Sequence, residues 1–346
     1  MTKKRDADEP SVVPDKHEPA DASTSAWTPA LVGLGSRGFC ASFPGIAFAH
    51  DLSLPSGPGV AHSLCICVDD FGLHAGINGA ALQLLESGRV HAIGGMVGAP
   101  AWGDGVAPLR RTADVDVGVD RPDIGLHLDL TDYPLLWATP PKLEYWILAS
   151  HLHLLNRHRL RAEIRAQLDT FEQSLGRPPA FIDGHRHVHQ LPVVRAELLA
   201  ELARRYGGFK PWLRSTRQPE AAARAGHPRI KPWLIEQLGG RGLRTLAQQR
   251  GYAQNRHLLG VYDFAGGTQA YARLLAGWVC DAADGDLLMC HPSLHLTPGD
   301  AVGAARFDEF CVLVSPYLGE LLLATQTTLR SLSGIMARMA RASTSV

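Results

Sequence analysis

The stretch Leu64-Cys-Ile-Cys-Val-Asp-Asp-Phe-Gly-Leu73 decides the fold, because a short apolar run ends directly in two carboxylates and a glycine. A run of this length bounded by a turn is typical of a buried strand. Apolar residues then recur at helical spacing over residues 77–85, Gly88 is a typical helix stop, and residues 91–97 form a second apolar run. The stretch therefore predicts the start of a β-α-β unit.

The same alternation of strand and helix patterns continues along the chain. Further strands are predicted at residues 123–128, 180–183 and 286–290. Further amphipathic helices are predicted at residues 160–175, 192–202 and 271–279. Strands that alternate with helices predict a mainly parallel sheet, and in such folds functional groups collect where the strands end.

Side chains of metal-ligand type stand at the ends of these predicted strands. Asp69 and Asp70 follow the first apolar run, His127 lies near the end of another, and His291 follows residues 286–290. A carboxylate with imidazoles is a common ligand set for a divalent ion that activates water. We expect Asp70 to bind the ion and Asp69 to accept the proton of the water, because adjacent residues leaving a strand diverge. His291 is a suitable proton donor for a departing amine.

The segment Asp183-Gly-His-Arg-His-Val-His189 holds three further histidines at alternate positions. On an extended segment, all three rings would lie on one face of the chain. Three ligands from this segment, added to those already named, exceed four-coordination, so some of the three have another role. We expect His187 or His189 to orient His185 or to line the substrate pocket.

Each of these features also has a purely structural explanation. An Asp-Asp pair before Phe-Gly suits a turn or a helix cap about as well as an active site. A single histidine such as His127 is more often a hydrogen-bonded core residue than a ligand. The agreement of several strand ends, rather than any one residue, favours a functional site.

The sequence lacks the motifs of several other enzyme classes. It contains no Gly-x-x-x-x-Gly-Lys phosphate loop and no Gly-x-Ser-x-Gly nucleophile elbow. Gly33-Leu-Gly-Ser-Arg-Gly38 spells a dinucleotide-binding motif, but no convincing strand precedes it and Pro44-Gly45 interrupts the helix that should follow. A glycosidase needs two carboxylates on either side of the bond between two sugars. Adjacent residues such as Asp69 and Asp70 are rarely far enough apart for this.

Composition narrows the class of protein further. The chain has 346 residues, 45% of them hydrophobic, with 34 basic and 34 acidic side chains and no formal net charge. A neutral chain lacks the basic field that attracts nucleic acid, and no apolar run reaches the roughly eighteen residues of a membrane span. The six cysteines form no Cys-x-x-Cys pair, which favours a reducing compartment. We expect a soluble, cytoplasmic protein, and a homodimer is compatible with its sequence.

The chain divides into four predicted parts. Residues 1–26 are expected to form a disordered tail, because charged residues, proline and serine dominate and no apolar signal-peptide core follows the first basic residues. Residues 27–60 are expected to be a linker or docking segment. Residues 61–330 form the predicted domain, and residues 331–346 a C-terminal helix and tail.

Four motifs together resemble the YdjC-like carbohydrate deacetylases, the family that includes chitooligosaccharide deacetylase and the HpnK-like proteins. The motifs are Val68-Asp-Asp-Phe-Gly-Leu73, Gly125-Leu-His-Leu-Asp-Leu-Thr131, Ile182-Asp-Gly-His-Arg-His-Val-His-Gln-Leu-Pro192 and Cys290-His-Pro292. The resemblance covers roughly residues 64–323 and is specific, because four separate motifs agree in order and spacing. It does not extend to the N-terminal tail.

This resemblance implies an α/β fold, an irregular (β/α) barrel of the glycoside hydrolase/deacetylase type. It also implies a divalent metal ion, magnesium or zinc, and removal of an acetyl group from an N-acetylated saccharide or glycolipid headgroup. By position it implies that Asp70, His127 and His185 bind the metal, that Asp69 is the base, and that His291 is the acid.

Three points stay open at this level. A metal-dependent hydrolase of another amide or ester on the same scaffold, such as a deformylase, is the main alternative, and a catalytically idle metal-binding protein is a minor one. His74 replaces the small residue that usually follows the Phe-Gly-Leu of the family. Residues 133–158 are either a substrate lid or an apolar helix packed on the barrel.

Overall fold

The computed structural model describes residues 61–114, 120–219 and 236–344, and the predicted tail and linker lie outside this part of the chain. The strands are β1 (His62–Phe71), β2 (Ala92–Gly95), β3 (Asp123–Leu128), β4 (Phe181–Gly184), β5 (Trp212–Leu213), β6 (Leu258–Leu259), β7 (Leu287–Cys290) and β8 (Thr327–Leu329). The α-helices are α1 (Ala75–Glu86), α2 (Trp102–Asp114), α3 (Leu143–His151), α4 (Arg157–Leu175), α5 (Pro192–Arg205), α7 (Arg241–Gln249), α8 (Gly267–Asp281), α9 (Gly303–Val314), α10 (Pro316–Ala324) and α11 (Leu332–Thr344). A 3₁₀ helix, η2 (His185–Gln190), and a short π-helix, η4 (Glu236–Gly240), complete the described elements.

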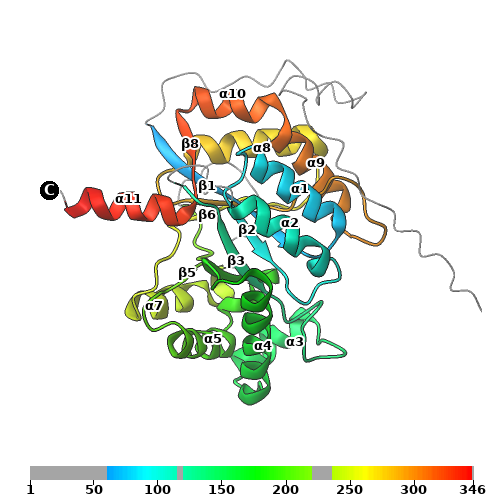
Figure 1. Ribbon diagram of the computed structural model, residues 1–346, viewed down its shortest axis with the longest axis vertical. Helices are drawn as coiled ribbons and strands as arrows, with labels where there is room; N and C mark the ends of the chain where they lie inside the picture. The colour runs from blue at the N-terminus through cyan, green and yellow to red at the C-terminus, as the bar shows by residue number, and fades with distance from the viewer. Residues whose placement is uncertain (1–60, 115–119, 220–235, 345–346) are drawn as a thin grey trace, which may run out of the picture. The chain divides into compact units, whose positions relative to one another are not determined.

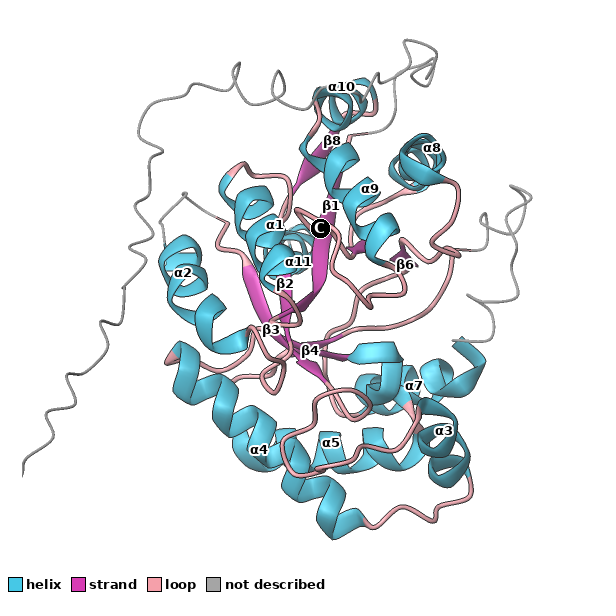
Figure 2. Cartoon of the chain, turned by 90° about the vertical axis from the view of Figure 1, so that its right-hand side faces the viewer, coloured by secondary structure: helices cyan, strands magenta, loops and turns pink. Residues whose placement is uncertain are grey.

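The strands form one parallel sheet with helices around it, as the alternating pattern predicts (Figures 1 and 2). The strand order is β5-β4-β3-β2-β1-β7-β6, and β8 pairs with the first residues of β1. All the named strand pairs are parallel. Parallel strands need crossover connections, and the helices between them supply these.

The sheet curls until its two edge strands meet, although no regular ladder joins them. The backbone N–H of Leu213 donates to the Ala253 carbonyl at 2.9 Å, and that of Leu258 donates to the Arg217 carbonyl at 2.8 Å. The Asn255 side chain adds bonds across the same seam to the backbone beside β5. The domain is therefore an irregular (β/α) barrel, and the predicted fold class is confirmed.

Residues of each strand alternate between the barrel interior and the surrounding helices. On β1, Leu64, Ile66 and Val68 pack outward in the large core that lies between strands and helices. Cys65 and Cys67 instead belong to a second cluster with residues from five other strands, namely Ala92, Phe181, Trp212, Leu258, Leu287 and Met289. This second cluster fills the barrel, because side chains two residues apart on a strand share one face.

The barrel filling depends on one glycine. The rings of Phe181 and Trp212 stack with centroids 4.3 Å apart. A Cβ atom on Gly125 would lie 2.4 Å from the Phe181 ring, so no larger residue fits at this inward position of β3. At the other end of the cluster, Leu332 and Ile335 from the start of α11 join the same interior group.

The helices agree closely with the sequence patterns. The Asn156 side chain caps α4 by accepting the backbone N–H of Arg159, and Gly176 ends the helix in the left-handed conformation. In the predicted lid or packing segment, α3 buries Trp146 and Ala149, so it is at least partly a helix packed on the domain. Among the described residues, no helix is both long enough and apolar enough to cross a bilayer.

Candidate metal centre

A ring of polar side chains closes the barrel interior at the carboxyl ends of the strands. Its members continue the inward positions of the core: Asp69 follows Cys67 on β1, His127 follows Gly125 on β3, and Asp183, Arg214 and His291 follow Phe181, Trp212 and Met289. All five lie on or directly after their strands and are largely buried. One strand register thus produces both the apolar filling and the polar layer above it.

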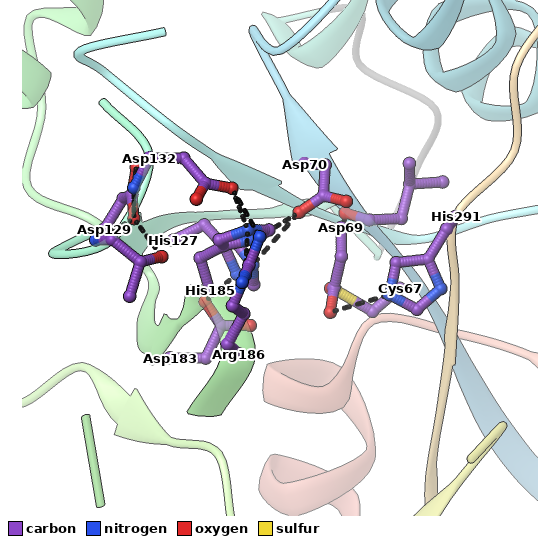
Figure 3. A network of polar contacts seen from close by, with 12 residues as sticks. Cys67, Asp69, Asp70, His127, Asp129, Asp132, Asp183, His185, Arg186 and His291 are labelled. Carbon is purple, nitrogen blue, oxygen red and sulfur yellow. Dashed lines mark hydrogen bonds and ion pairs between the residues drawn. The ribbon is translucent and has the colours of Figure 1, made fainter. Parts of the chain in front are cut away.

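Asp70 departs from this alternation because β1 is irregular at that point. The register between β1 and β2 shifts between Val68 and Phe71, and Asp70 has a φ of 64°. This left-handed conformation is uncommon for a residue other than glycine, although aspartate tolerates it better than most. The two adjacent carboxylates consequently point into different surroundings, as Figure 3 shows.

The Asp70 carboxylate faces two imidazoles. Its Oδ1 atom lies 3.4 Å from Nε2 of His127 and 2.9 Å from Nδ1 of His185. One donor atom from each of the three residues falls within 4.8 Å of the other two. β1, β3 and η2, which follows β4 directly, therefore bring the three predicted ligands to one point (Figure 3).

The second nitrogen of each imidazole is held by a further carboxylate. Nδ1 of His127 lies 2.7 Å from Asp183, and Nε2 of His185 lies 2.9 Å from Asp132. Carboxylates in this position fix the tautomer and orientation of metal-binding histidines. The donor set of one carboxylate and two oriented imidazoles therefore fits a divalent metal ion.

Without a metal, the same carboxylates hold protons on the imidazoles. Burial lowers the pKa of His185, but Asp70 and Asp132 overcome this and raise it to about 9. Burial likewise opposes protonation of His127, and Asp183 and Asp69 raise its pKa well above the usual range. A metal ion would displace these protons, because only neutral imidazole is a ligand.

Asp70 has one more partner, on α9. Nη2 of Arg306 lies 2.7 Å from Oδ2 of Asp70, while Nε of the same guanidinium donates to Asp300. Burial raises the pKa of Asp70, but the nearby Arg306 and His185 outweigh it and keep that pKa well below its usual range. Arg306 donates to Oδ2 of Asp70. The other oxygen, Oδ1, faces His127 and His185.

Asp69 lies on the other side of the pair and contacts an arginine. Nη1 of Arg214 is 2.5 Å from Oδ2 of Asp69, and Nη2 is 2.6 Å from Oδ1. Nη2 also lies 2.6 Å from Asp183. Burial raises the pKa of Asp69, but the Arg214 guanidinium more than offsets this and holds it well below its usual range. Asp69 is therefore an ionised carboxylate inside the barrel.

His291 stands beyond Asp69, away from the two imidazoles (Figure 3). Its Nε2 atom lies 4.0 Å from Oδ2 of Asp69. Its backbone N–H donates to Glu309 at 2.5 Å, and its ring meets the Phe264 ring edge to face at 5.3 Å between centroids. The predicted acid thus lies near the predicted base, and Glu309 fixes the backbone that carries it.

The expectation of an extended segment with three imidazoles on one face is wrong. After Gly184 the chain winds into η2, and Arg186 and His187 adopt left-handed φ values of 52° and 59°. The rings separate as a result: Nε2 of His189 donates to the Arg214 carbonyl at 3.0 Å. Nδ1 of His187 is buried without a hydrogen bond to any described residue. His185 hydrogen-bonds to Asp70 and Asp132 rather than to His187 or His189, so the predicted orienting role finds no support in the geometry.

Four residues of the site escaped the sequence analysis: Asp132, Asp183, Arg214 and Arg306. Asp183 and Arg214 share the inward register of His127, and that register could have identified them once the barrel was expected. Asp132 lies in the loop after β3, and Arg306 lies on a helix. No local pattern distinguishes these two from ordinary surface charges.

The cysteines take no part in a disulfide among the described residues. Cys65, Cys67, Cys290 and Cys311 are buried and Cys280 is exposed, while Cys40 lies outside the described part. Burial raises the pKa of the Cys67 thiol well above its usual range, although its sulfur lies 3.1 Å from Arg214. These buried thiols act as small apolar residues, as their positions in apolar runs predict.

Comparison with known proteins shows which family this chain matches. The profile of the family described as YdjC-like protein matches residues 63–324. A chitooligosaccharide deacetylase of Yersinia pestis (strain Pestoides F) is 28% identical over 148 residues, which cover 41% of this chain and 55% of the relative. A chitooligosaccharide deacetylase of Yersinia enterocolitica serotype O:8 is 29% identical over 138 residues, covering 38% and 52%. The chain spans about half the length of the curated relatives it matches.

A solved structure supports the fold independently. A protein of Enterococcus faecalis V583, described as a cellobiose-phosphate cleavage protein, superimposes with a TM-score of 0.60 and 21% sequence identity. The alignment covers 80% of this chain and 99% of that one. At this identity the likeness establishes the barrel architecture alone.

Proposed function

This chain belongs to the YdjC-like protein family, and from that membership we propose that it is a metal-dependent hydrolase that removes an acetyl group from an N-acetylated saccharide. The family assignment covers the whole of the described barrel up to α10. The names of the curated relatives support the reaction class, because they are chitooligosaccharide deacetylases. We therefore assign deacetylation to the candidate metal centre at the carboxyl ends of the strands.

One observation carries the proposal: the two carboxylates of Asp69-Asp70 lie in different electrostatic surroundings. Oδ1 of Asp70 faces His127 and His185 and its Oδ2 faces Arg306, whereas both oxygens of Asp69 accept from Arg214. A hydrolase needs one group that helps to hold a metal and a separate group that accepts a proton. The irregular end of β1 provides both from neighbouring positions.

Asp70, His127 and His185 would hold the metal, which when bound polarises the acetamide carbonyl and lowers the pKa of a water molecule. Asp69 accepts the proton of the attacking water. Arg214 orients this carboxylate through both oxygens and keeps it ionised.

His291 supplies a proton on the side of Asp69 away from the imidazoles. Breaking an amide bond requires a proton on the departing amine, which is otherwise a poor leaving group. The edge of the Phe264 ring and the bond from the His291 backbone to Glu309 restrict how the imidazole can move. Asp69 and His291 lie next to each other, with 4.0 Å between Oδ2 and Nε2, so a base and an acid in these positions could serve the same substrate group.

The test is metal analysis of the purified protein coupled to acetate release from a panel of N-acetylglucosamine-containing compounds. The proposal expects one divalent ion per chain and acetate production. Two imidazole nitrogens favour zinc over magnesium, and the analysis decides between them. Release of formate from N-formyl compounds, without acetate from any N-acetyl compound, would establish the deformylase alternative instead.

Variants of the adjacent carboxylates separate their roles. Asp70→Ala is expected to lose both bound metal and turnover, whereas Asp69→Asn keeps the metal and loses most of the turnover. Loss of metal in Asp69→Asn would make Asp69 a ligand. Full metal content and full acetate release in Asp70→Ala would refute the assignment of the site.

A further inference from the structure

Large apolar side chains that remain exposed are concentrated in one segment of the described chain. Of the eleven such residues, seven fall between residues 133 and 154. Five of them form what we call the α3 patch: Leu136, Tyr145, Leu148, Leu152 and Leu154, with exposed fractions of 48, 51, 63, 57 and 70%. The other four described residues of this kind are scattered over the fold. Concentrated exposed apolar surface marks an interaction site more often than isolated leucines do.

α3 is apolar on both of its sides. Trp146, Ala149 and Ser150 are buried against the domain. Tyr145, Leu148 and Leu152 recur at spacings of three and four residues and therefore share the opposite, exposed face. A helix on the surface of a globular protein normally turns polar residues toward water. The outward leucines thus leave most of their apolar surface in contact with water.

The chain around this patch is basic. Between residues 142 and 161 it contains four lysine or arginine residues and three histidines but only one acidic residue, Glu144. Arg157 is exposed and forms an ion pair with Glu197, and Arg159 lies 4.6 Å from the centre of the Trp137 ring. Leucines beside arginines in an exposed helix and loop are typical of segments that lie in a membrane interface.

The patch lies beside the candidate metal centre. α3 contacts η2, the turn that carries His185, and it lies next to α5 (Figure 2). The loop before α3 starts directly after Asp132, and Glu163 accepts the backbone N–H groups of Leu135 and Leu136 at 2.7 Å each. The patch is therefore fixed to the site rather than attached through a free linker.

We propose that the α3 patch docks this protein onto an anionic lipid bilayer. The leucines enter the boundary of the acyl chains, and the surrounding arginines meet the negative headgroups. The charge distribution favours a bilayer over a second copy of the chain, because a two-fold interface would bring two positive rims together. The proposal does not depend on which bond the site hydrolyses.

Flotation of the full-length protein with vesicles tests the proposal. Binding is expected to vesicles of phosphatidylcholine with phosphatidylglycerol, and to be at least tenfold weaker with phosphatidylcholine alone. The triple variant Leu148→Gln/Leu152→Gln/Leu154→Gln is expected to lose binding by about 100-fold or more. Arg157→Gln leaves Arg161 to pair with Glu197 and is expected to weaken binding only to the anionic vesicles.

Leu323→Gln is the matched control, because Leu323 on α10 is 81% exposed and lies outside the patch. It is expected to bind vesicles as the unmodified chain does, and circular dichroism confirms that each variant is folded. Failure of the unmodified chain to float would overturn the proposal, and so would equal binding by the triple variant. Light scattering that shows a dimer, converted to monomers by the triple variant without vesicle binding by either, would assign the patch to self-association instead.

Discussion

Arg214 and Asp69 form a doubly hydrogen-bonded ion pair across the barrel interior, although 145 positions separate them in the sequence. Asp69 lies on β1 and Arg214 directly follows β5, two strands that do not pair with each other. Arg214 is fully buried and also reaches Asp183. One side chain therefore joins the proposed base to the residue that orients His127.

Replacing Arg214 is expected to affect stability and catalysis separately. Arg214→Met leaves Asp69 and Asp183 buried without a counter-charge, which should lower the free energy of unfolding by about 3–5 kcal/mol. Arg214→Lys keeps the charge but not the two-pronged geometry, so it should fold and lose roughly 100-fold in kcat. Denaturant unfolding and acetate release measure the two effects. Unchanged stability in Arg214→Met would contradict the pairing.

Asp183→Asn is expected to weaken metal binding by roughly 10–100-fold, because the amide no longer fixes the His127 tautomer as a carboxylate does. The measurement is metal affinity by competition with a chelator. Asp123→Asn is the control, since Asp123 is a buried carboxylate on β3, the strand of His127, that accepts from Trp212 and contacts neither imidazole. Equal losses in the two variants would show a general structural effect instead.

Two glycine substitutions should change stability in opposite directions. Gly260 has a φ of 89°, and a Cβ atom there would lie 2.1 Å from the Met289 carbonyl oxygen, so Gly260→Ala should destabilise by at least about 2 kcal/mol. Gly277 lies exposed within α8 with open space around it, so Gly277→Ala should stabilise by about 0.5–1 kcal/mol. Thermal or denaturant unfolding measures both, and a stable Gly260→Ala variant would contradict the packing at the end of β6.

His189 should contribute to acid lability. It is fully buried, and burial lowers its pKa from 6.5 to about 4. Between these values the unfolded chain binds more protons than the folded one, so the free energy of unfolding falls as the pH drops from 6.5 to 4, by up to about 3 kcal/mol.

The comparison with His189→Gln isolates this contribution. The glutamine can still donate to the Arg214 carbonyl but does not titrate, so its free energy of unfolding should change less over that pH range. Urea unfolding at several pH values measures the difference between the two proteins. Parallel curves would show that His189 is not the group concerned.

The sequence was informative about the strand ends because apolar runs and the polar residues after them are local patterns. The convergence of Asp70, His127 and His185 follows from three such ends in one parallel sheet. The very short strands β5 and β6 are different, because two residues carry no detectable period. The position of Arg214 after β5 was therefore hidden, even though it is central to the site.

The turn at η2 shows a second limit. Arg186 and His187 adopt left-handed conformations in succession without glycine or asparagine at either position. Local preferences favour an extended or right-handed backbone there. The contacts of His185 with Asp70 and of His189 with Arg214 hold this turn in place, and such long-range contacts leave no local signature.

The position of β1 has a consequence for biosynthesis. This strand pairs with β2 on one side, but its other neighbours come late: Cys65 pairs with Leu287, and Leu64 pairs with Leu329. As the chain leaves the ribosome, one edge of β1 stays open until nearly the whole barrel has been translated. Such an edge is a site for misassociation during slow folding. The full pairing of β1 is therefore one of the last steps of folding, possible only once β7 and β8 have been translated.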